Sequence, residues 1–150
     1  MSNDIDREAI ARVTRSLYAA ISGPAGPRDW EVHRASFHPT GRQIRTGVDA
    51  EGRPWIKSMD PDEYQNDAQP VFDRTDFFEQ ELKSRIDILG NVAHVWSLYE
   101  ARVDRASLEP ERRGINSIQL FKDETGQWKI VSMIWDNERS GVDVEPFDAS

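Results

Sequence analysis

Histidine and tyrosine are the residue types through which this sequence most readily supplies acid–base chemistry, and it has three of each. His38 stands directly before Pro39 at the end of an expected helix, and an imidazole titrates near neutral pH, which makes it a candidate general base. The alternative is a histidine that only bonds the backbone at a helix end. Tyr18 lies beside the apolar stripe of the first expected helix, where its hydroxyl either enters a cavity or packs in the core. His38 and Tyr18 are therefore the two candidate catalytic residues.

Several other catalytic schemes find no support in the sequence. Cysteine is absent, which removes disulfides, thiolate nucleophiles and cysteine-bound metals. The histidines show no short metal-ligand spacing, and acids such as Asp136 and Glu138 at a strand end are usually solvated. No phosphate-binding loop, dinucleotide fingerprint or nucleophile elbow occurs. We therefore expect neither a metal nor a cofactor.

Length and charge narrow the class of protein. The 150 residues suit one domain, which we place at 1–150, and the apolar fraction of 37% supports one core. The net charge of −8 repels phosphate backbones and anionic lipids, so we expect no nucleic-acid partner and no membrane partner. The polar, acidic start of the chain does not resemble a signal peptide, and no apolar stretch reaches transmembrane length. A cytoplasmic location is the expectation.

Three helices and six strands are expected to position the candidate residues. Helical spacing of apolar residues predicts helices over 5–22, 28–37 and 61–72, the last opened by a capping box between Asp60 and Glu63. Short strands are expected over 42–46 and 54–59, and longer ones over 77–89, 91–104, 112–122 and 127–137. Helices followed by a long antiparallel meander predict an α+β fold. In the first long strand, charged residues at odd positions predict one wet face: Glu79, Glu81, Lys83, Arg85 and Asp87.

The turn between the first two long strands decides which residues face the helices. Gly90-Asn91 is typical of a two-residue hairpin turn, which would pair Leu89 with Val92. A slip by one residue would exchange the two faces of the sheet. With the later strands matched by their apolar residues, the inner face and the helices predict a small-molecule pocket with His38 near its rim. Its predicted lining is Tyr18, Phe37, Trp55, Tyr64, Val95, Tyr99, Asn116, Ile118, Met133 and Trp135.

The opposite face of the predicted sheet is too apolar to remain in water. We expect a homodimer built on this outer face, because two-fold pairing of one patch is the commonest way to bury it. The predicted patch consists of Trp96, Leu98, Gln119, Phe121, Ile130 and Ile134. The alternative is that the C-terminal segment from Val142 to Phe147 folds back over this face.

The order of elements and several local phrases resemble one known superfamily. The phrases are Leu17-Tyr18-Ala19-Ala20-Ile21, Phe37-His38-Pro39, Gly90-Asn91-Val92-Ala93-His94-Val95, Arg113-Gly114-Ile115-Asn116-Ser117-Ile118-Gln119-Leu120 and Gly126-Gln127-Trp128-Lys129-Ile130. In this order they resemble the nuclear-transport-factor-two-like superfamily over nearly the whole chain. The resemblance implies a cone-shaped, curved antiparallel sheet with a mixed edge and three N-terminal helices on its concave face. It also implies an apolar ligand in the cone and, in many members, a dimer through the sheet.

The resemblance leaves the reaction open, since the superfamily holds enzymes and non-catalytic domains. An isomerase of the ketosteroid kind would match Tyr18, but no carboxylate lies near Arg42 to Arg45, and Ile118 stands where its second acid would be. An epoxide-hydrolase arrangement needs two inward carboxylates and an arginine, which the predicted register does not supply. Tyr18, His38, Tyr64 and Tyr99 are the residues available for a dehydratase-like site. We therefore predict a small-molecule-binding domain with an apolar pocket. The alternative is a cofactor-free dehydratase, cyclase or isomerase acting on a small apolar or aromatic compound.

Overall fold

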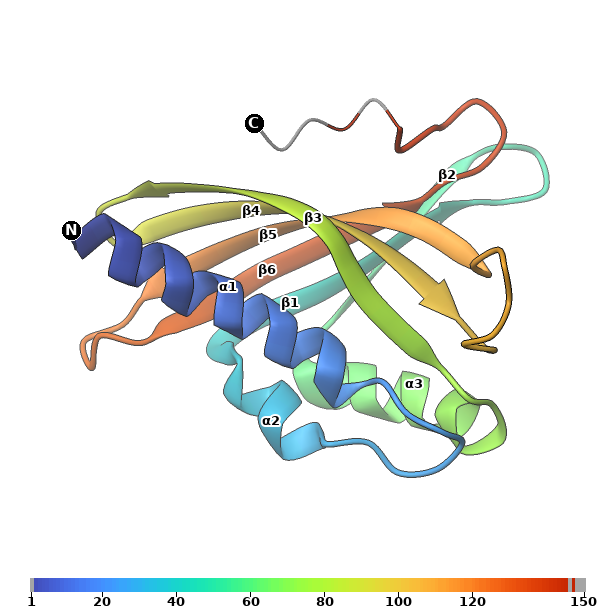
Figure 1. Cartoon of the computed structure of the whole chain (residues 1–150), viewed down its shortest axis with the longest axis horizontal. Coiled ribbons are helices and arrows are strands. Elements are labelled where there is room, and N and C mark those ends of the chain that lie inside the picture. Colours follow the sequence, from blue (N-terminus) through green and yellow to red (C-terminus); the bar gives the residue numbers. More distant parts are fainter. Residues whose placement is uncertain (1, 146, 148–150) are drawn as a thin grey trace.

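The computed structural model describes residues 2–145 and 147, which form one curved six-stranded sheet with helices against it (Figure 1). The helices are α1 (Ser2–Ala20), α2 (Trp30–Ala35) and α3 (Pro61–Arg74). The strands are β1 (Phe37–Val48), β2 (Pro54–Met59), β3 (Phe78–Leu89), β4 (Val92–Arg102), β5 (Arg112–Lys122) and β6 (Trp128–Asn137). The expected α+β class and the positions of the four long strands are confirmed.

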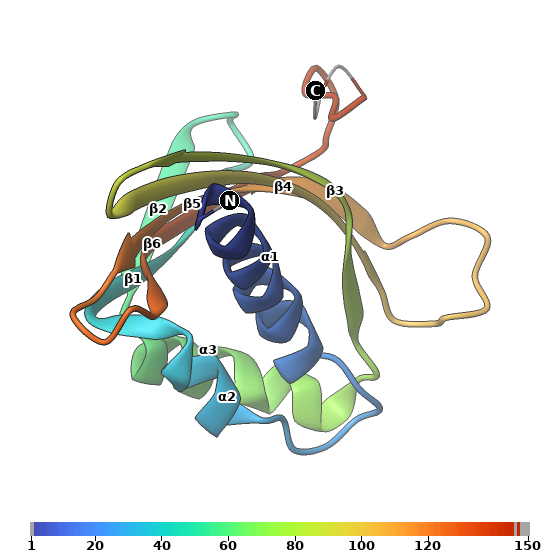
Figure 2. The ribbon, with the colours of Figure 1, turned by 60° about the vertical axis from the view of Figure 1, so that its left-hand side comes forward.

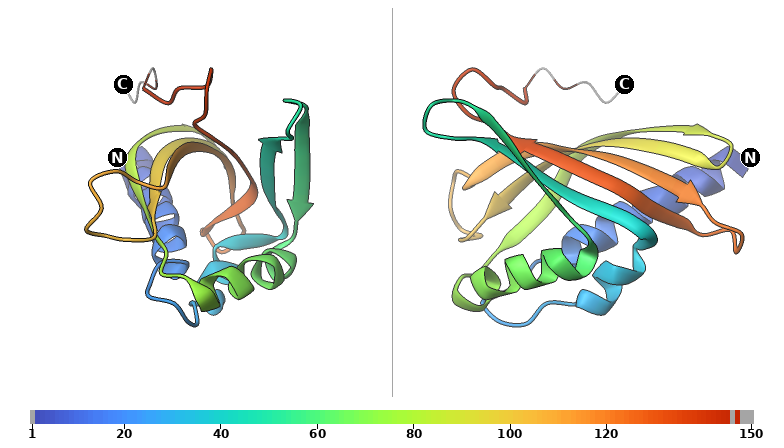
Figure 3. Two further views of the ribbon diagram at one scale, coloured as in Figure 1. Left: turned by 90° about the vertical axis from the view of Figure 1, so that its right-hand side faces the viewer. Right: turned by 180° about the vertical axis from the view of Figure 1, so that it is seen from behind.

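The sheet is mixed, with strand order β2-β1-β6-β5-β4-β3. Strand β1 runs parallel to β6, and the other neighbouring pairs are antiparallel. The helices lie on the concave side, with α1 along the sheet and α2 and α3 closing one end (Figures 2 and 3). The helices and the concave face therefore enclose the interior of the molecule.

Local sequence signals explain where the helices begin. The expected capping box is present at α3: Glu63 N donates to Asp60 Oδ1, and Asp60 N donates to Glu63 Oε1. Helix α2 begins at Trp30, two residues later than predicted, because the Asp29 side chain accepts a hydrogen bond from Val32 N and caps the helix there. In the part of the chain that the structure describes, no helix is both long enough and apolar enough to cross a membrane.

The hairpin turn sets the register of β3 and β4 as predicted. Gly90 adopts a φ of 58°, and Leu89 pairs with Val92. On β4 the residues Val95, Ser97 and Tyr99 consequently face the helices, and each is at most 3% exposed. One end of the interior is a dry core under α1, made by Ile10, Leu17, Phe37, Ala93, Val95, Ile118, Leu120, Trp128, Ile130 and Met133.

A bulge in β3 overturns the prediction that its charged residues share one wet face. Glu81 pairs with Tyr99 but Lys83 pairs with Leu98, so Leu82 is an extra residue without a partner across the strand. The extra residue reverses the alternation, and Glu79 and Glu81 therefore face the helices while Lys83 faces outward. Both carboxylates were expected in solvent on the outer face.

A second bulge corrects the predicted outer face at Ile130. Gln119 pairs with Ser132, whereas Leu120 pairs with Ile130, so one residue of β6 is bypassed. Ile130 is consequently turned into the core, where it is 0% exposed, and it does not belong to the outer patch.

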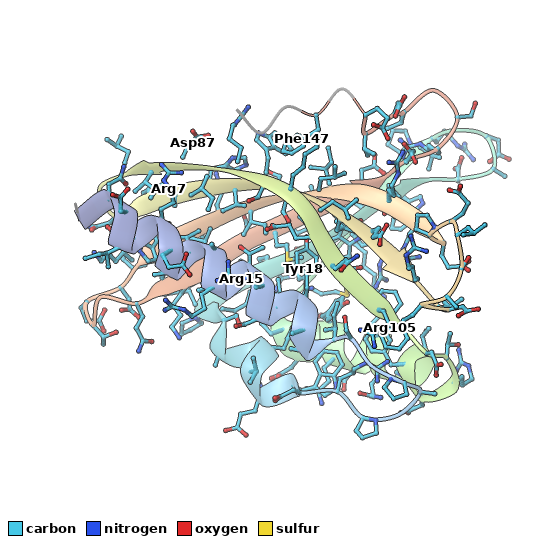
Figure 4. All side chains as sticks on the ribbon, in the orientation of Figure 1. Arg7, Arg15, Tyr18, Asp87, Arg105 and Phe147 are labelled. Carbon is cyan, nitrogen blue, oxygen red and sulfur yellow. The ribbon has the colours of Figure 1, made fainter. Side chains whose placement is uncertain are left out.

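The C-terminal segment lies over the convex face of the sheet, as the alternative to the dimer anticipated (Figures 1 and 4). Val144 is only 5% exposed, and Lys83 Nζ lies 5.7 Å from the centre of the Phe147 ring. Leu98, which pairs with Lys83 on the outward side of the sheet, is 4% exposed within a single chain. Leu98 is therefore already buried and adds little to an exposed patch.

Candidate functional site

A cavity of about 630 Å³ lies between the concave face of the sheet and helices α1 and α3. Its walls are largely aromatic, with Tyr18, Trp55, Tyr64, Phe72, Phe77, Tyr99 and Trp135. Charged residues also line it: Arg45, Asp67, Glu79, Arg112, Asp136, Glu138 and Arg139. The cavity is therefore much more polar than the apolar pocket that the sequence predicted. Its volume is within the range of ordinary ligand sites.

The inner face of the sheet is organised in rows of residues that pair across the strands. The outermost row contains Glu79, Ala101 and Arg112. The next row contains Glu81, Tyr99, Gly114 and Asn137, and the third contains Ser97, Asn116, Trp135 and Arg45. Deeper rows are apolar and belong to the core under α1. The polar groups are thus gathered at the end of the sheet that α1 leaves uncovered.

A hydrogen-bonded chain runs from Asn116 to Glu81 through buried groups. Asn116 Nδ2 donates to Tyr18 Oη at 2.8 Å, Tyr18 Oη lies 2.7 Å from Ser97 Oγ, and Ser97 Oγ lies 2.5 Å from Glu81 Oε2. An ionised carboxylate only accepts, so Ser97 donates to Glu81 and Tyr18 donates to Ser97. Burial raises the pKa of Tyr18 above its ordinary value, so this hydroxyl stays protonated.

The direction of donation along this hydrogen-bonded chain has two consequences for Tyr18, the candidate catalytic tyrosine. Tyr18 has one proton, and Ser97 receives it, so Tyr18 is not free to donate to a ligand while the chain is intact. The Tyr18 oxygen accepts from the Asn116 amide nitrogen, which orients the amide. The other amide atom, Asn116 Oδ1, is buried and has no hydrogen-bond partner among the described residues. An unpaired buried acceptor is unusual and suggests a missing partner.

Tyr99 forms the floor of the cavity beside this chain. Its hydroxyl donates to Asn137 Oδ1 at 2.6 Å, and it reaches across Gly114 to do so. A Cβ on Gly114 would meet Tyr99 Oη and the backbone oxygen of Asp136. Glycine at this position therefore leaves the space through which the Tyr99 hydroxyl reaches Asn137.

His33 belongs to an aromatic cluster on the helical wall. His33 is 1% exposed, and its ring is stacked on the Tyr64 ring with 5.3 Å between the ring centres. Its Nε2 donates to Gln43 Oε1 at 3.0 Å. Burial lowers the pKa of His33 to about 4, so the ring is neutral at pH 7 and serves to hold the wall.

Glu79 is the carboxyl group best placed for proton transfer. Its side chain lines the cavity, and none of the described residues forms a hydrogen bond or an ion pair with its carboxylate. Burial raises the pKa of Glu79 to about 7, against the opposing charge of Arg112. A carboxyl group with this pKa is present in both protonation states near pH 7, as a general acid or base requires.

The structure brings together most of the residues predicted for the pocket. Seven of them line the cavity: Tyr18, Trp55, Tyr64, Tyr99, Asn116, Met133 and Trp135. Phe37, Val95 and Ile118 do face inward, but α1 packs on them, so they belong to the core and not to the cavity. His38 does not lie at the rim, because β1 begins at Phe37 and turns His38 toward the outer Phe121, whose ring centre is 5.8 Å away. His38 Nδ1 lies 2.8 Å from Thr40 Oγ1, and the candidate base is thus excluded from the cavity.

Sequence reasoning missed Glu79 and Arg112, which line the cavity, and Glu81, which faces inward and accepts a hydrogen bond from Ser97. Alternation in β3 pointed the two carboxylates to the wet face, and no local signal marks Leu82 as a bulge. Two inward carboxylates and an arginine are therefore present, contrary to the sequence-based exclusion of such a set. Among residues 2–145 and 147, no group of three or more histidine, aspartate or glutamate residues is placed to hold a metal ion.

Comparisons with known proteins find similar folds among solved structures but no matching sequence. No family model and no curated protein sequence matches the chain. A Nostoc punctiforme protein of unknown function with a cystatin-like fold superposes with a TM-score of 0.70 at 16% identity, covering 91% of this chain and 93% of that one. A proposed dehydratase of the NTF2-like family from Streptomyces avermitilis superposes with a TM-score of 0.67 at 14% identity, covering 91% of this chain and 99% of that one. A proposed ketosteroid isomerase from Shewanella frigidimarina superposes with a TM-score of 0.57 at 20% identity, covering 85% of this chain and 94% of that one.

These likenesses extend over nearly the whole chain, and the expected resemblance is confirmed at the level of the fold. The chain has the nuclear-transport-factor-two-like fold. Identities of 20% or less carry no reaction with them, because one fold hosts many functions. The function must therefore be argued from the cavity itself.

Proposed function

We propose that the chain is a small-molecule-binding domain whose cavity performs cofactor-free acid–base chemistry on a ring compound, with Glu79 as the proton-transferring group. The observation that carries this proposal is the Glu79 carboxylate, which faces the cavity without a hydrogen-bond partner among the described residues. A half-buried carboxylate held only for structure would be paired, because removing an unpaired carboxylate from water is costly. The aromatic walls favour a flat, cyclic ligand.

The proposed site assigns different tasks to its residues. Glu79 takes up or releases the proton. Tyr64 lines the cavity, and its hydroxyl forms no hydrogen bond with any of the described residues, so this hydroxyl is available to the ligand. Tyr18 and Tyr99 hold the floor in place, since their protons go to Ser97 and Asn137. The proposed names of two structural neighbours, a dehydratase and a ketosteroid isomerase, fit proton transfer of this kind.

A nitrobenzisoxazole tests the base without knowledge of the natural substrate. A base removes the proton from the carbon atom of the isoxazole ring, the resulting electron pair forms the nitrile as the N–O bond breaks, and a coloured cyanonitrophenolate is released. We expect saturable turnover whose rate rises with pH and levels off above about 7. Glu79→Gln should reduce this rate at least about 100-fold, since general-base catalysis contributes that much.

The control is Glu51→Gln, which removes a carboxylate from the exposed turn before β2 and should leave the rate unchanged. Turnover that survives Glu79→Gln would refute the base assignment. Tight binding of ring compounds without any Glu79-dependent turnover would favour the alternative, a binding domain without catalysis.

We also propose that the outer face of the sheet forms a homodimer, through a smaller patch than the sequence indicated. Trp96, Phe121 and Ile134 are half-buried on this face, and Gln119 is exposed. Ile130 is not part of it, and Leu98 is covered within the chain. Half-buried aromatic side chains in one patch favour self-association.

Light scattering at micromolar concentration tests the dimer. We expect twice the 17.2 kDa mass of one chain, and the mass of one chain after Trp96→Glu with an unchanged circular dichroism spectrum. Val142→Glu, a substitution at an exposed position in the C-terminal segment, is the control and should leave the dimer intact. A monomer at all concentrations would mean that the C-terminal segment alone protects this face.

A further inference from the structure

Two charged side chains of the cavity, Arg112 and Glu79, form no ion pair and no side-chain hydrogen bond in the described part of the chain. The Arg112 guanidinium makes no hydrogen bond or ion pair there, and its carbon lies 5.7 Å from the centre of the Phe77 ring. The other charged lining residues are paired: Arg45 with Asp67 at 2.6 Å, Arg139 with Asp136 at 2.6 Å, and Glu138 with Arg113 at 3.0 Å. Arg112 is thus the cation of the cavity that is open to a ligand.

Arg112 and Glu79 act on each other only through their charges, at longer range than an ion pair. They flank Ala101 in one row of the sheet, which separates their Cα atoms by about 10 Å, two strand spacings. No ion pair joins them. An arginine keeps its proton at any physiological pH, so this site presents a permanent positive charge next to a group that titrates.

A second, independent observation lies deeper in the cavity. Asn116 Oδ1 is an unpaired acceptor on a residue that is 1% exposed, and the hydrogen bond to Tyr18 fixes the amide in that orientation. Asn116 lies four residues from Arg112 on the same face of β5, a distance of about 13 Å between Cα atoms. Gly114 lies between them, and the Tyr99 hydroxyl lies over it. An acceptor and a cation therefore mark the two ends of an aromatic floor.

We propose that the ligand is a ring-containing organic anion, with a carboxylate or similar anionic oxygen at Arg112 and a hydroxyl that donates to Asn116 Oδ1. This proposal rests on the small-molecule site proposed above and replaces the neutral apolar ligand expected from the sequence. A guanidinium binds a carboxylate through paired, charge-assisted hydrogen bonds, which a neutral ring does not provide. A buried amide oxygen gains a hydrogen bond only from an O–H or N–H donor.

The two charges predict how binding responds to pH. An anion at Arg112 reduces the positive field at Glu79 and adds a like charge, so it raises the pKa of Glu79 beyond about 7. Binding then takes up a proton, and affinity falls as the pH rises above about 7. The other titratable or charged groups around Glu79 are Tyr18 and Arg15 on α1, Tyr64 on α3, Glu81 on β3, Tyr99 on β4 and Arg105 after β4.

Calorimetry with the full chain tests the ligand class through matched compounds. The probe is the hydroxynaphthoate whose hydroxyl and carboxylate stand at opposite ends of the ring system, against its methyl ester and against naphthoate without the hydroxyl. We expect the hydroxynaphthoate to bind at least about tenfold more tightly than the ester and about fivefold more tightly than the naphthoate. These comparisons need no substitution and so do not depend on the folding of a variant.

Two variants test whether Arg112 and Glu79 cause the preference for the anion over the ester and its dependence on pH. Arg112→Met should remove the preference for the anion over the ester, whereas Arg74→Met, which removes an exposed charge from the last turn of α3, should preserve it. Glu79→Gln should abolish the change of affinity between about pH 6 and about pH 8. Equal binding of ester and anion, a preference that survives Arg112→Met, or no binding at about 1 mM would overturn the proposal.

The outcome is separable from that of the proposed catalysis. Arg112-dependent anion binding without Glu79-dependent ring opening of the nitrobenzisoxazole would support the ligand class and reject the catalytic role. Ring opening that depends on Glu79, together with equal binding of ester and anion, would support the catalytic role and reject the proposed ligand class.

Discussion

Replacing Glu79 by glutamine is expected to stabilise the protein by about 2 kcal/mol more at about pH 8 than at about pH 5. Burial raises the pKa of Glu79 from an ordinary value of 4.5 to about 7. Between these two values the folded chain binds more protons at this group than the unfolded chain does. The contribution of Glu79 to stability therefore declines as the pH rises through this window and stays constant above about 7.

Glutamine has the same shape but no charge to bury, so the variant does not suffer this decline. The full shift would correspond to about 3 kcal/mol, and we expect less because part of the side chain borders the open cavity. His33 acts with the opposite sign: its pKa is lowered to about 4, so its contribution to stability rises with pH up to its ordinary value of 6.5. Comparing variant and wild type at each pH cancels the His33 contribution.

Urea unfolding at the two pH values measures the difference. Glu51→Gln, which removes an exposed charge, should give no difference between the two pH values beyond about 0.5 kcal/mol. An equal effect of Glu79→Gln at both pH values would mean that the carboxylate is solvated and is not poised near neutrality.

The second large effect is expected at Gly114, where alanine should cost about 3 kcal/mol of stability. The added Cβ would come within 2.6 Å of the backbone oxygen of Asp136 and 2.7 Å of Asn137 Oδ1, and it would also strike Tyr99 Oη. A backbone oxygen in the neighbouring strand cannot move aside without breaking the pairing of β5 and β6. The hydrogen bonds between β5 and β6 and the hydrogen bond from Tyr99 to Asn137 should therefore both be strained.

Thermal unfolding and ligand titration together measure this effect. The matched control is Gln119→Ala, on the exposed side of the same strand, for which we expect a change within about 0.5 kcal/mol. A Gly114→Ala protein as stable as the wild type, with unchanged binding of the hydroxynaphthoate, would show that Tyr99 does not need to lie against the bare backbone.

The features that depend on neighbouring residues in the chain were predictable from the sequence. Helical spacing of apolar residues located α1, and the Asp60–Glu63 capping box located the start of α3. The Gly90-Asn91 turn fixed the register of β3 and β4, because a two-residue turn leaves one pairing of the adjoining residues. That register in turn brought Tyr99 and Asn116 to the inner face, where they line the cavity.

The position predicted for His38 depended on an element boundary, and the structure places its side chain away from the cavity rim. The residue before a proline is driven to extended geometry, and here the extended segment is the start of β1 and not the end of a helix. Pairing of β1 with β6 then decides which way the side chain points, and it points away from the helices.

The α+β class, the order of the elements and the aromatic lining of an internal space follow from residue patterns along the chain. The tertiary structure decided the chemistry of that space, because a single bulged residue, Leu82, turns Glu79 and Glu81 inward. Likewise a bulge opposite Leu120 sends Ile130 to the core, and the folded-back segment around Val144 covers the outer face. Side-chain alternation along a strand is local, but the position of a bulge is set by the curvature that the whole sheet needs to close over the helices.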